Sequence, residues 1–438
     1  MGETPQTSPK QSKSAFAARE GAIGLLDGVL EDRLQLSELT QGIGPLSGLD
    51  PADKARAQRL ATETLRHLSR ADALIERYVD RMPPLTALNV LRLAVTELMV
   101  EHEAPHGVVD SAVTLMRRSR QSRRMSGLAN AVLRKVATEG ADIWAELPVP
   151  SLPKWLRRRI VHIYNEEIVQ AIEASHLAGA PLDLTPKDPS AAQALADSLS
   201  GTLLPTGSVR LAKGGQVSAM PGYDAGEWWV QDAGAALAVK LLAPQSGEAV
   251  LDLCAAPGGK TMQLAASGAH VTAIDSSSKR MTRVKENLAR TGLTAELIRA
   301  DIMDWEAEQF YDAILLDAPC SATGTIRRHP DLPFARTGKD MDPIFELQSA
   351  MIDRALIALK PGGRLVYCTC SLLTEEGERQ AKTAMERHNL TEIAPDAKAL
   401  GLDPSWLHPN GGIRLRPDHF AQYGGIDGFF MISLRKPG

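Results

Sequence analysis

The four cysteines of this chain are the residues whose types and positions most suggest chemistry. They are Cys254, Cys320, Cys368 and Cys370. Cys320 and Cys370 each stand among small residues just after an apolar run, in Asp317–Ser321 and Thr369–Ser371. Thiols in such loops suit nucleophilic catalysis, whereas Cys368 directly continues an apolar run and fits a small buried side chain. A zinc site is the other alternative, but no C-x-x-C pair occurs, so we expect no metal.

A turn of small residues follows the apolar run Ala249–Leu253. Its residues are Cys254, Ala255, Ala256, Pro257, Gly258, Gly259, Lys260 and Thr261. Two adjacent glycines let a cofactor approach the backbone closely. A Walker A loop is excluded because Cys254 stands where that loop needs its first glycine, and the dinucleotide fingerprint G-x-G-x-x-G is absent. A plain strand-to-helix turn remains the alternative, although it leaves the acids that follow unexplained.

Acidic residues end the next two apolar runs. The run His270–Ile274 leads into Asp275, which follows Gly259 by 16 residues, and Leu297–Ala300 leads into Asp301. An acid about 20 residues beyond such a turn suits the hydroxyls of a ribose, and Asp301 is placed to reach an adenine amino group. A lone aspartate at a strand end is more often a helix cap. Two of them beside a double-glycine turn favour an adenosine-bearing cofactor, and S-adenosylmethionine rather than NAD because the third glycine is missing.

From about residue 226 onward, short apolar runs alternate with loops and helical stretches. The runs are Ala249–Leu253, His270–Ile274, Ala313–Leu316 and Gly363–Tyr367. This rhythm predicts the α/β class, with a doubly wound, mostly parallel, Rossmann-like sheet. Since ligands of such sheets bind at the carboxyl ends of the strands, we expect the glycine turn, the acids and the two cysteine loops to meet at one edge.

The part from about residue 15 to 140 is helical in pattern throughout. Apolar residues recur at helical spacing from Ala57 to Leu68, after Asp50-Pro51, which resembles an N-cap followed by a proline in the first turn. Further stripes run from Leu88 to Leu98 and from Leu128 to Val136. These stripes predict a compact all-α bundle.

Five arginines crowd together within this helical part. They are Arg117, Arg118, Arg120, Arg123 and Arg124. The run is either a solvated helix end with its loop or a phosphate-binding patch, and the lack of interleaved aromatic residues leaves both interpretations open. Between residues 141 and 225 the signal is weaker, but Leu182–Leu184 and Val209–Leu211 predict strands in a small linking subdomain.

The composition bounds what kind of protein these parts make. With 438 residues, 44% hydrophobic and 23% charged, the chain has the balance of a soluble globular protein of two or three domains. No apolar run reaches the roughly 18 residues of a membrane span, and residues 1–14 lack the apolar core of a signal peptide. We expect a cytoplasmic monomer without membrane contact, disordered over residues 1–14. The net charge of −4 means that any RNA contact rests on local basic patches.

On these residues the chain resembles the RsmB (Sun/Fmu) family of 16S ribosomal RNA cytosine-C5 methyltransferases, within the NOL/NOP/Sun group. The similarity lies in Leu251–Thr261, Asp317–Ser321, Thr369–Ser371, Arg327–Asp331, Val230–Asp232 and Asp427–Phe430. In the helical part, Gly127–Arg134 is similar to the NusB-like domain of that family. The resemblance covers nearly the whole chain beyond residue 14.

The resemblance implies a domain order, a cofactor and a partner. It implies a NusB-like RNA-binding domain at 15–140, a small α+β linking subdomain at 141–225, and a class I S-adenosylmethionine-dependent methyltransferase domain with a seven-stranded sheet at 226–438. The partner would be 16S ribosomal RNA, free or in an assembling small subunit. The residues implied to bind S-adenosylmethionine are Cys254, Ala255, Ala256, Pro257, Gly258, Gly259, Lys260, Asp275, Arg280, Asp301 and Asp317.

The resemblance also implies catalytic roles. Carbon 5 of cytosine is a poor nucleophile until a thiolate adds at carbon 6, and the family assigns this attack to Cys370 and product release to Cys320. Asp317 would stabilise the charge that develops at ring nitrogen 3, and Lys260 or a nearby arginine would favour the Cys370 thiolate. The target base must be unstacked for the thiol to reach it.

The chain departs from the family pattern at three places. Ala322 replaces the first glycine of the family's Cys-Ser-Gly-Thr-Gly, Cys368 replaces a small residue, and Leu182–Thr185 lacks the usual Arg-x-Asn strand. Two other functions remain open: a transfer RNA cytosine-C5 methyltransferase, and a non-catalytic RNA-binding factor of ribosome assembly. The intact acids and cysteines argue against the second, because a protein that had lost its chemistry would spare few of them.

Overall fold

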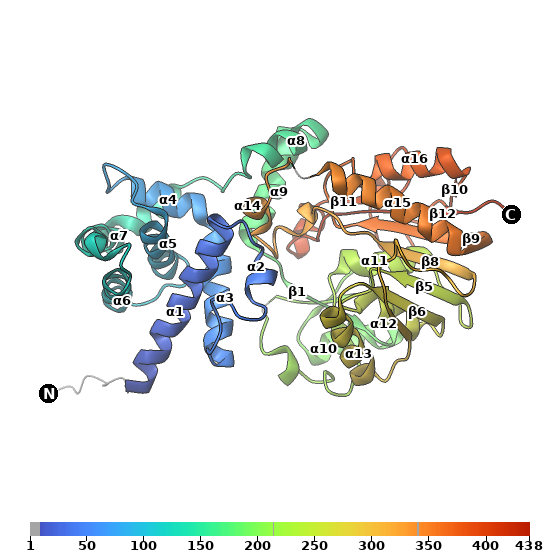
Figure 1. The fold of residues 1–438 in the computed structure, drawn as a ribbon, viewed down its shortest axis with the longest axis horizontal. Helices are drawn as coiled ribbons and strands as arrows, with labels where there is room; N and C mark the ends of the chain where they lie inside the picture. Colours follow the sequence, from blue (N-terminus) through green and yellow to red (C-terminus); the bar gives the residue numbers. More distant parts are fainter. Residues whose placement is uncertain (1–8, 213, 340) are drawn as a thin grey trace. The chain divides into compact units, whose positions relative to one another are not determined.

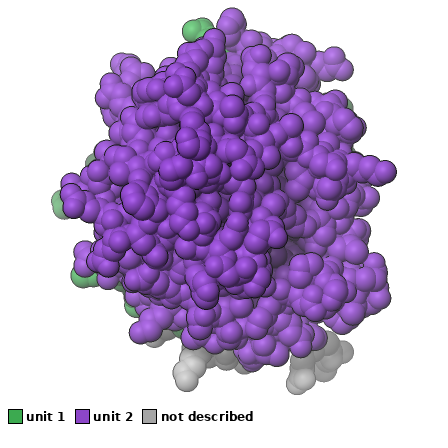
Figure 2. Space-filling model, turned by 90° about the vertical axis from the view of Figure 1, so that its right-hand side faces the viewer, with its two compact units in different colours: residues 1–158, 169–177, 328–337 green, residues 159–168, 178–327, 338–438 purple. Residues whose placement is uncertain are grey.

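The computed structural model describes residues 9–212, 214–339 and 341–438, and the chain forms two compact units. Unit 1 comprises the residues up to 158 together with 169–177 and 328–337, and unit 2 comprises 159–168, 178–327 and 338–438 (Figures 1 and 2). Unit 1 has one hydrophobic core of its own, and the large sheet of unit 2 has a core on each face. The domain boundaries expected at residues 140 and 225 stay a prediction.

Unit 1 is built mainly from helices, as the apolar stripes predict. They are α1 (Pro9–Leu30), α2 (Leu36–Leu39), α3 (Pro51–Arg66), α4 (Leu68–Glu76), α5 (Leu85–Met99), α6 (Pro105–Arg118), α7 (Ser126–Glu146) and α14 (Leu332–Ala335). Asp50 caps α3 by accepting a hydrogen bond from the backbone N of Asp53, and every residue of α5 from Ala87 to Leu98 is buried. The helical bundle is therefore confirmed, with α5 as its central helix. The residues of α8 (Lys154–Tyr164) and α9 (Glu166–Ala178) are divided between the two units.

The five clustered arginines lie at the end of α6 and in the residues that follow it. All five are exposed, as both interpretations of the run require. Arg118 pairs with Glu20 at 2.8 Å and lies over the ring of Phe16, 4.7 Å from its centroid. Residues 1–8 of the expected lead-in lie outside the described residues, and α1 begins at Pro9. No described helix combines the length and apolar character that crossing a bilayer requires.

Unit 2 contains a small antiparallel sheet in addition to its large sheet. Its strands are β1 (Leu182–Pro186), β2 (Thr202–Leu203), β3 (Val209–Leu211) and β4 (Trp228–Val230), in the order β2-β3-β1-β4, with α10 (Ala192–Ser198) beside them. The two strands predicted in this segment are confirmed as β1 and β3. Asp183 of β1 forms a buried, two-pronged ion pair with Arg210 of β3, at 2.6 and 2.7 Å.

The large sheet has the doubly wound, mostly parallel order that the sequence predicts (Figure 1). Its strands are β5 (Ala249–Leu253), β6 (His270–Asp275), β7 (Glu296–Arg299), β8 (Tyr311–Asp317), β9 (Leu359–Thr369), β10 (Thr391–Glu392), β11 (Ile413–Leu415) and β12 (Phe429–Arg435). The order within the described chain is β10-β12-β9-β8-β5-β6-β7, and β11 pairs with β12 outside this path. Strands β5 to β9 run parallel, and β12 runs antiparallel to β9.

Helices cover both faces of this sheet because alternate strand residues point to opposite sides. They are α11 (Ala233–Leu242), α12 (Gly259–Ala266), α13 (Ser278–Thr291), α15 (Asp342–Ala358) and α16 (Glu378–His388). Val250 and Val366 pack with α11 on one face, whereas the neighbouring Leu251 and Leu365 pack with α15 on the other. The α/β class is confirmed.

A buried arginine ties three distant segments of unit 2 together. Arg327 is fully buried; its Nε donates to Asp427 Oδ1 at 2.5 Å and its Nη2 donates to Asp232 Oδ2 at 2.8 Å. A third bond runs from Nη1 to the carbonyl of Gly424 at 3.0 Å. Asp232 also caps α11 by accepting from the backbone N of Gly234. Three of the segments that carry the family resemblance therefore meet at this one buried ion cluster.

Candidate active site

The carboxyl ends of β9, β8, β5 and β6 lie side by side, and each delivers one of the predicted segments. The registers Asp317↔Cys368, Leu253↔Leu316 and Leu253↔Ile274 place these strand ends level with one another. The glycine turn follows β5, Asp275 ends β6, the Cys320 loop follows β8 and Cys370 follows β9. The sequence prediction that these groups share one edge is confirmed.

The backbone conformation of the glycine turn requires small residues. Gly258 has a φ of 101°, and a Cβ there would lie 3.1 Å from Val284 of α13. The buried carboxylate of Asp275 braces the turn by accepting from the backbone N of Ala256 at 3.3 Å and from Ser277 N at 2.9 Å. Arg280 pairs with the same carboxylate at 2.8 Å. Asp275 thus supports the turn, and Arg280 pairs with Asp275.

A cavity of about 310 Å³ lies in front of this turn. Of the predicted cofactor residues, those that line it are Cys254, Ala255, Ala256, Pro257, Gly259, Lys260 and Asp317. Tyr223, Asn287 and Arg290 line it as well, although no motif in the sequence pointed to them. Asp252 also lines it, and its Oδ1 is buried with no hydrogen-bond partner in the described chain. A buried acceptor without a donor and a wall of small residues fit a cofactor that carries hydroxyl and amino groups.

Asp301 takes the alternative role that the sequence allowed. It is exposed, and its Oδ1 accepts from the backbone N of Met303 at 2.9 Å. It is therefore the cap of a turn after β7, and the residues that line the cavity do not include it within the described chain. Asp275 contacts the glycine turn directly, whereas the role of Asp301 toward a cofactor stays a prediction.

Asp317 is paired with the lysine of the glycine turn. Lys260 Nζ lies 2.7 Å from Asp317 Oδ2, and Cys368 donates its thiol hydrogen to Asp317 Oδ1 over 3.5 Å. Burial is the largest single influence and lowers the pKa of Lys260, but the charge of Asp317, the hydrogen bond to it and the nearby Cys368 and Asp252 together raise that pKa overall, so the ammonium keeps its proton. Burial, with Asp317 next, raises the pKa of Cys368 well above its usual range. Cys368 is fully buried, which matches the expectation of a structural thiol.

The two loop cysteines lie in contact with each other. Cys320 Sγ and Cys370 Sγ are 3.4 Å apart, and both side chains are half-buried. The hydrogen bond to Cys370, followed by burial, raises the pKa of Cys320 well above its usual range. Cys320 therefore holds its proton, and either sulfur can be the donor in the contact between the two thiols.

Backbone hydrogen bonds join the Cys320 loop to the residue that follows β9 and to the residue that precedes β12. Gly324 N donates to the carbonyl of Cys370 at 2.9 Å, and Gly428 N donates to the carbonyl of Gly324 at 2.8 Å. A Cβ on Gly324 would lie 2.0 Å from the Gly428 carbonyl oxygen, so only glycine fits there. The glycine retained in the family motif is thus required by the close approach of two backbones.

The residue that sequence reasoning missed is Glu376. It is fully buried, six residues after Cys370, and hydrogen-bonds to both cysteine loops. Nothing in its neighbourhood marks it as different from the exposed or half-buried glutamates beside it. Only the folded loops reveal its position.

We expect Ala322→Gly to stabilise the protein by about 0.5–1 kcal/mol. Ala322 has a φ of 56°, a left-handed conformation that costs an L-residue roughly 1–2 kcal/mol, part of which glycine loses again through the entropy of the unfolded chain. Urea unfolding measures the change. Ala350→Gly in the middle of α15 is the control, since it should cost about 1 kcal/mol. If Ala322→Gly lowered the free energy of unfolding as much as Ala350→Gly does, the backbone of Ala322 would not be strained.

We expect the stability of the ligand-free protein to fall as the pH rises from 5 to 7 because of Asp252. Burial raises the pKa of this carboxyl to about 7, against a bond from Thr261 and the charge of Lys260. The native state thus keeps a proton that the unfolded chain has lost above about pH 4, and the unfolding free energy drops by roughly 2–3 kcal/mol over this range.

Urea titrations of the wild type and of Asp252→Asn at pH 5 and pH 8 measure this effect. The variant carries no titrating proton at this position, so its unfolding free energy should lack that part of the drop. Equal pH slopes for the two proteins would show that Asp252 titrates normally.

Comparison with known proteins gives two family matches. Residues 239–435 match the model of 16S rRNA methyltransferase RsmB/F, and residues 17–138 match the NusB family. Among curated proteins, the ribosomal RNA small subunit methyltransferase B of Cronobacter sakazakii is 34% identical over 451 residues, which cover 97% of this chain and all of that protein. The protein of the same name from Yersinia enterocolitica is 33% identical, with 97% and 100% covered.

Solved structures agree with the fold. A methyltransferase homologue from Pyrococcus horikoshii is similar with a TM-score of 0.55 and 26% identity, over 65% of this chain and 95% of that one. The large sheet with its glycine turn is therefore the fold of S-adenosylmethionine-dependent methyltransferases, and the helical bundle is similar to NusB.

Proposed function

Since this chain belongs to the RsmB/F family of 16S ribosomal RNA methyltransferases, we propose that it methylates carbon 5 of a cytosine in that RNA through a covalent bond to Cys370. The observation that carries the proposal is the pair of thiols 3.4 Å apart at the carboxyl edge of the sheet. In domain terms, 15–140 would bind RNA, 141–225 would link, and 226–438 would catalyse. We propose that the protein acts in the cytoplasm as a monomer.

The cavity in front of the glycine turn is the place we propose for the cofactor. S-adenosylmethionine supplies, when bound, a methyl group on a positively charged sulfur. The turn from Cys254 to Lys260 would hold it, and the unpartnered oxygen of Asp252 offers an acceptor to its polar groups. Asp275, paired with Arg280, would keep the turn in place.

Cys370 would begin the reaction as a nucleophile. Its thiolate forms a bond to carbon 6 of the ring, and the electron pair of the double bond moves to carbon 5, which can then accept the methyl group. Ring nitrogen 3 gains electron density in this step, and the Lys260–Asp317 pair, 2.7 Å apart, offers it a proton. That pair stands at the cavity wall, where the cofactor and the base would meet.

Cys320 would act when the product leaves. The proton on carbon 5 is lost to water, its electron pair restores the ring double bond, and the bond between carbon 6 and Cys370 breaks with its electrons on sulfur. The protonated thiol of Cys320 then donates a hydrogen bond to the departing sulfur across the 3.4 Å contact. Without this donor the covalent adduct would persist.

A methyl-transfer assay tests the proposed reaction and substrate. The protein is incubated with labelled S-adenosylmethionine and with unmodified 16S RNA, assembled small subunits or transfer RNA, and the RNA is digested to nucleosides. We expect 5-methylcytidine from the 16S RNA or the subunits. Label in another nucleoside would overturn the carbon-5 assignment, label in transfer RNA alone would overturn the substrate, and no label at all would favour a non-catalytic assembly factor.

A further inference from the structure

We propose that Glu376 is a positioning residue that clamps the two cysteine loops together, and that release of the methylated RNA depends on it. The inference rests on the proposed function, and it concerns a residue outside the predicted site. Glu376 lies in the loop between β9 and α16 and is fully buried. In the described chain its carboxylate is held by hydrogen-bond donors from both loops.

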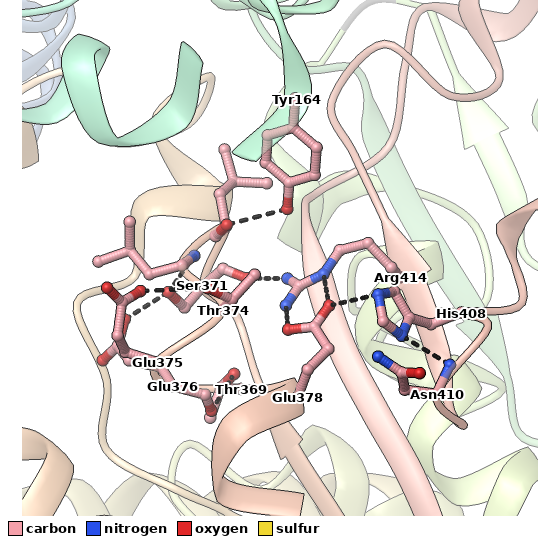
Figure 3. A network of polar contacts seen from close by, with 12 residues as sticks. Tyr164, Thr369, Ser371, Thr374, Glu375, Glu376, Glu378, His408, Asn410 and Arg414 are labelled. Atoms are coloured by element: carbon pink, nitrogen blue, oxygen red, sulfur yellow. Dashed lines mark hydrogen bonds and ion pairs between the residues drawn. The ribbon is translucent and has the colours of Figure 1, made fainter. Parts of the chain in front are cut away.

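One carboxylate bridges the residues that directly follow the two cysteines. Glu376 Oε1 accepts from the backbone N of Ser321 at 2.8 Å, and Oε2 accepts from the hydroxyls of Ser321 and Ser371. Figure 3 labels Glu376 and Ser371 as members of the same polar network. Since Ser321 follows Cys320 and Ser371 follows Cys370, the positions of both thiols depend on the same side chain.

Further buried groups tighten this clamp. Gln348 Nε2 donates to Glu376 Oε1 at 3.1 Å and to the carbonyl of Pro319 at 2.8 Å, on the other side of Cys320. Thr323 Oγ1 lies 3.2 Å from the hydroxyls of Ser321 and Ser371. Apart from the Gln348 Oε1 atom, which has no hydrogen-bond partner in the described chain, the side-chain polar atoms named here are hydrogen-bonded. Such a network favours one arrangement of its members, because each unmade bond would leave a buried polar group without a partner.

The other end of Glu376 is also held. Its carbonyl oxygen accepts from the hydroxyl of Tyr367 at 2.7 Å and from Thr369 Oγ1 at 3.3 Å, both on β9. The buried Arg414 also holds this loop, since it donates to the Ser371 carbonyl and forms a two-pronged pair with Glu378 (Figure 3). The backbone of Glu376 is therefore anchored to the sheet, and its carboxylate holds both loops in place relative to the sheet.

The two cysteines do not depend equally on the clamp. Cys370 directly follows β9, and its neighbour Thr369 is paired in register with Phe430 of β12. Cys320 lies three residues beyond the end of β8, and the contacts of Pro319 and Ser321 with Gln348 and Glu376 hold its loop. Loss of the clamp would thus displace Cys320 more than Cys370, so that attack continues while release fails.

Glu376→Gln tests the inference, with Glu375→Gln as the matched control. Glu375 is the preceding glutamate, half-buried, and bonds only with Thr374 and Arg379 in the described chain. A displacement of about 1 Å at a reacting group costs up to about 100-fold. We expect Glu376→Gln to lower multiple-turnover methylation by about 10- to 100-fold and to accumulate a denaturation-resistant RNA adduct. Its KM for RNA should stay unchanged, and Glu375→Gln should match the wild type.

The outcomes separate this inference from the proposed function. A wild type that forms no 5-methylcytidine overturns both. An active wild type with a folded Glu376→Gln protein that turns over normally and shows no extra adduct overturns the clamp alone. If Glu376→Gln does not fold, the Ser321→Ala/Ser371→Ala double variant, which removes both hydroxyl contacts, decides the question. Adduct accumulation in that variant supports the clamp, and normal turnover contradicts it.

Discussion

Cys370→Ala should transfer methyl groups to RNA at least about 10⁴-fold more slowly than the wild type, whereas Cys320→Ala should trap the RNA on the protein. Removing a nucleophile that forms a covalent intermediate leaves only the rate that binding and electrostatics provide. Removing Cys320 leaves the attack intact but takes away the donor that lies 3.4 Å from the departing sulfur. The two substitutions therefore have opposite effects on the amount of adduct.

A denaturing gel with labelled methyl donor measures both effects at once. Cys320→Ala should show a labelled protein–RNA band, and Cys370→Ala should show none. Cys368→Ala tests whether the additional thiol takes part: since Cys368 is fully buried, we expect this variant to keep methyl transfer within about tenfold of the wild type. An adduct in Cys370→Ala that disappears in Cys368→Ala would mean that the nucleophile had been assigned to the wrong residue.

Arg327→Met should lower the free energy of unfolding by about 3–5 kcal/mol. The side chain of Arg327 is fully buried and pairs with Asp232 and Asp427, whose side chains are less than a tenth exposed. Breaking a buried ion pair from one side leaves uncompensated charge in a medium that solvates it poorly. Here one substitution removes the arginine partner of two buried carboxylates, and the cap of α11 is weakened as well.

Urea unfolding of Arg327→Met and of two further variants measures this loss. Arg379→Met removes an exposed arginine that lies 3.7 Å from its partner, and it should change stability by less than about 0.5 kcal/mol. Arg327→Met/Asp427→Asn removes one of the stranded charges and should recover part of the loss. A drop below about 1 kcal/mol for Arg327→Met would contradict the account of a buried ion cluster.

Local sequence patterns predicted those parts of the site that directly follow a strand. Apolar runs predicted the strands, and because parallel strands end at one edge, the places of Cys320, Cys370 and the glycine turn followed. Asp301 is a different case, because a strand-end aspartate can contact a ligand or cap a turn, and local sequence does not distinguish the two. In the fold its Oδ1 accepts from the backbone N of Met303. The bracing role of Asp275 needed the fold, since it depends on the backbone of Ala256.

Long-range pairing explains what the sequence could not predict. Glu376 and Ser321 are 55 positions apart, and Arg327 and Asp427 are 100 apart. No periodicity links such residues, because their contact depends on the order of the strands and on loop conformation. Lys260 is a similar case. The sequence analysis expected Lys260 or a nearby arginine to favour the Cys370 thiolate, and only the structure shows that the partner of Lys260 at 2.7 Å is Asp317.

Because of the contact between Gly324 and Gly428, the Cys320 loop can close only after residue 428 has been synthesised. In the ribosome β12 is made after every other strand of its sheet, yet it lies beside β9 and holds the Cys320 loop through Gly428. A nascent chain that ends before residue 428 has all its thiols and its glycine turn but lacks the backbone against which that loop closes. The catalytic edge is thus assembled only once translation has passed residue 428, and a polypeptide released earlier would be inert.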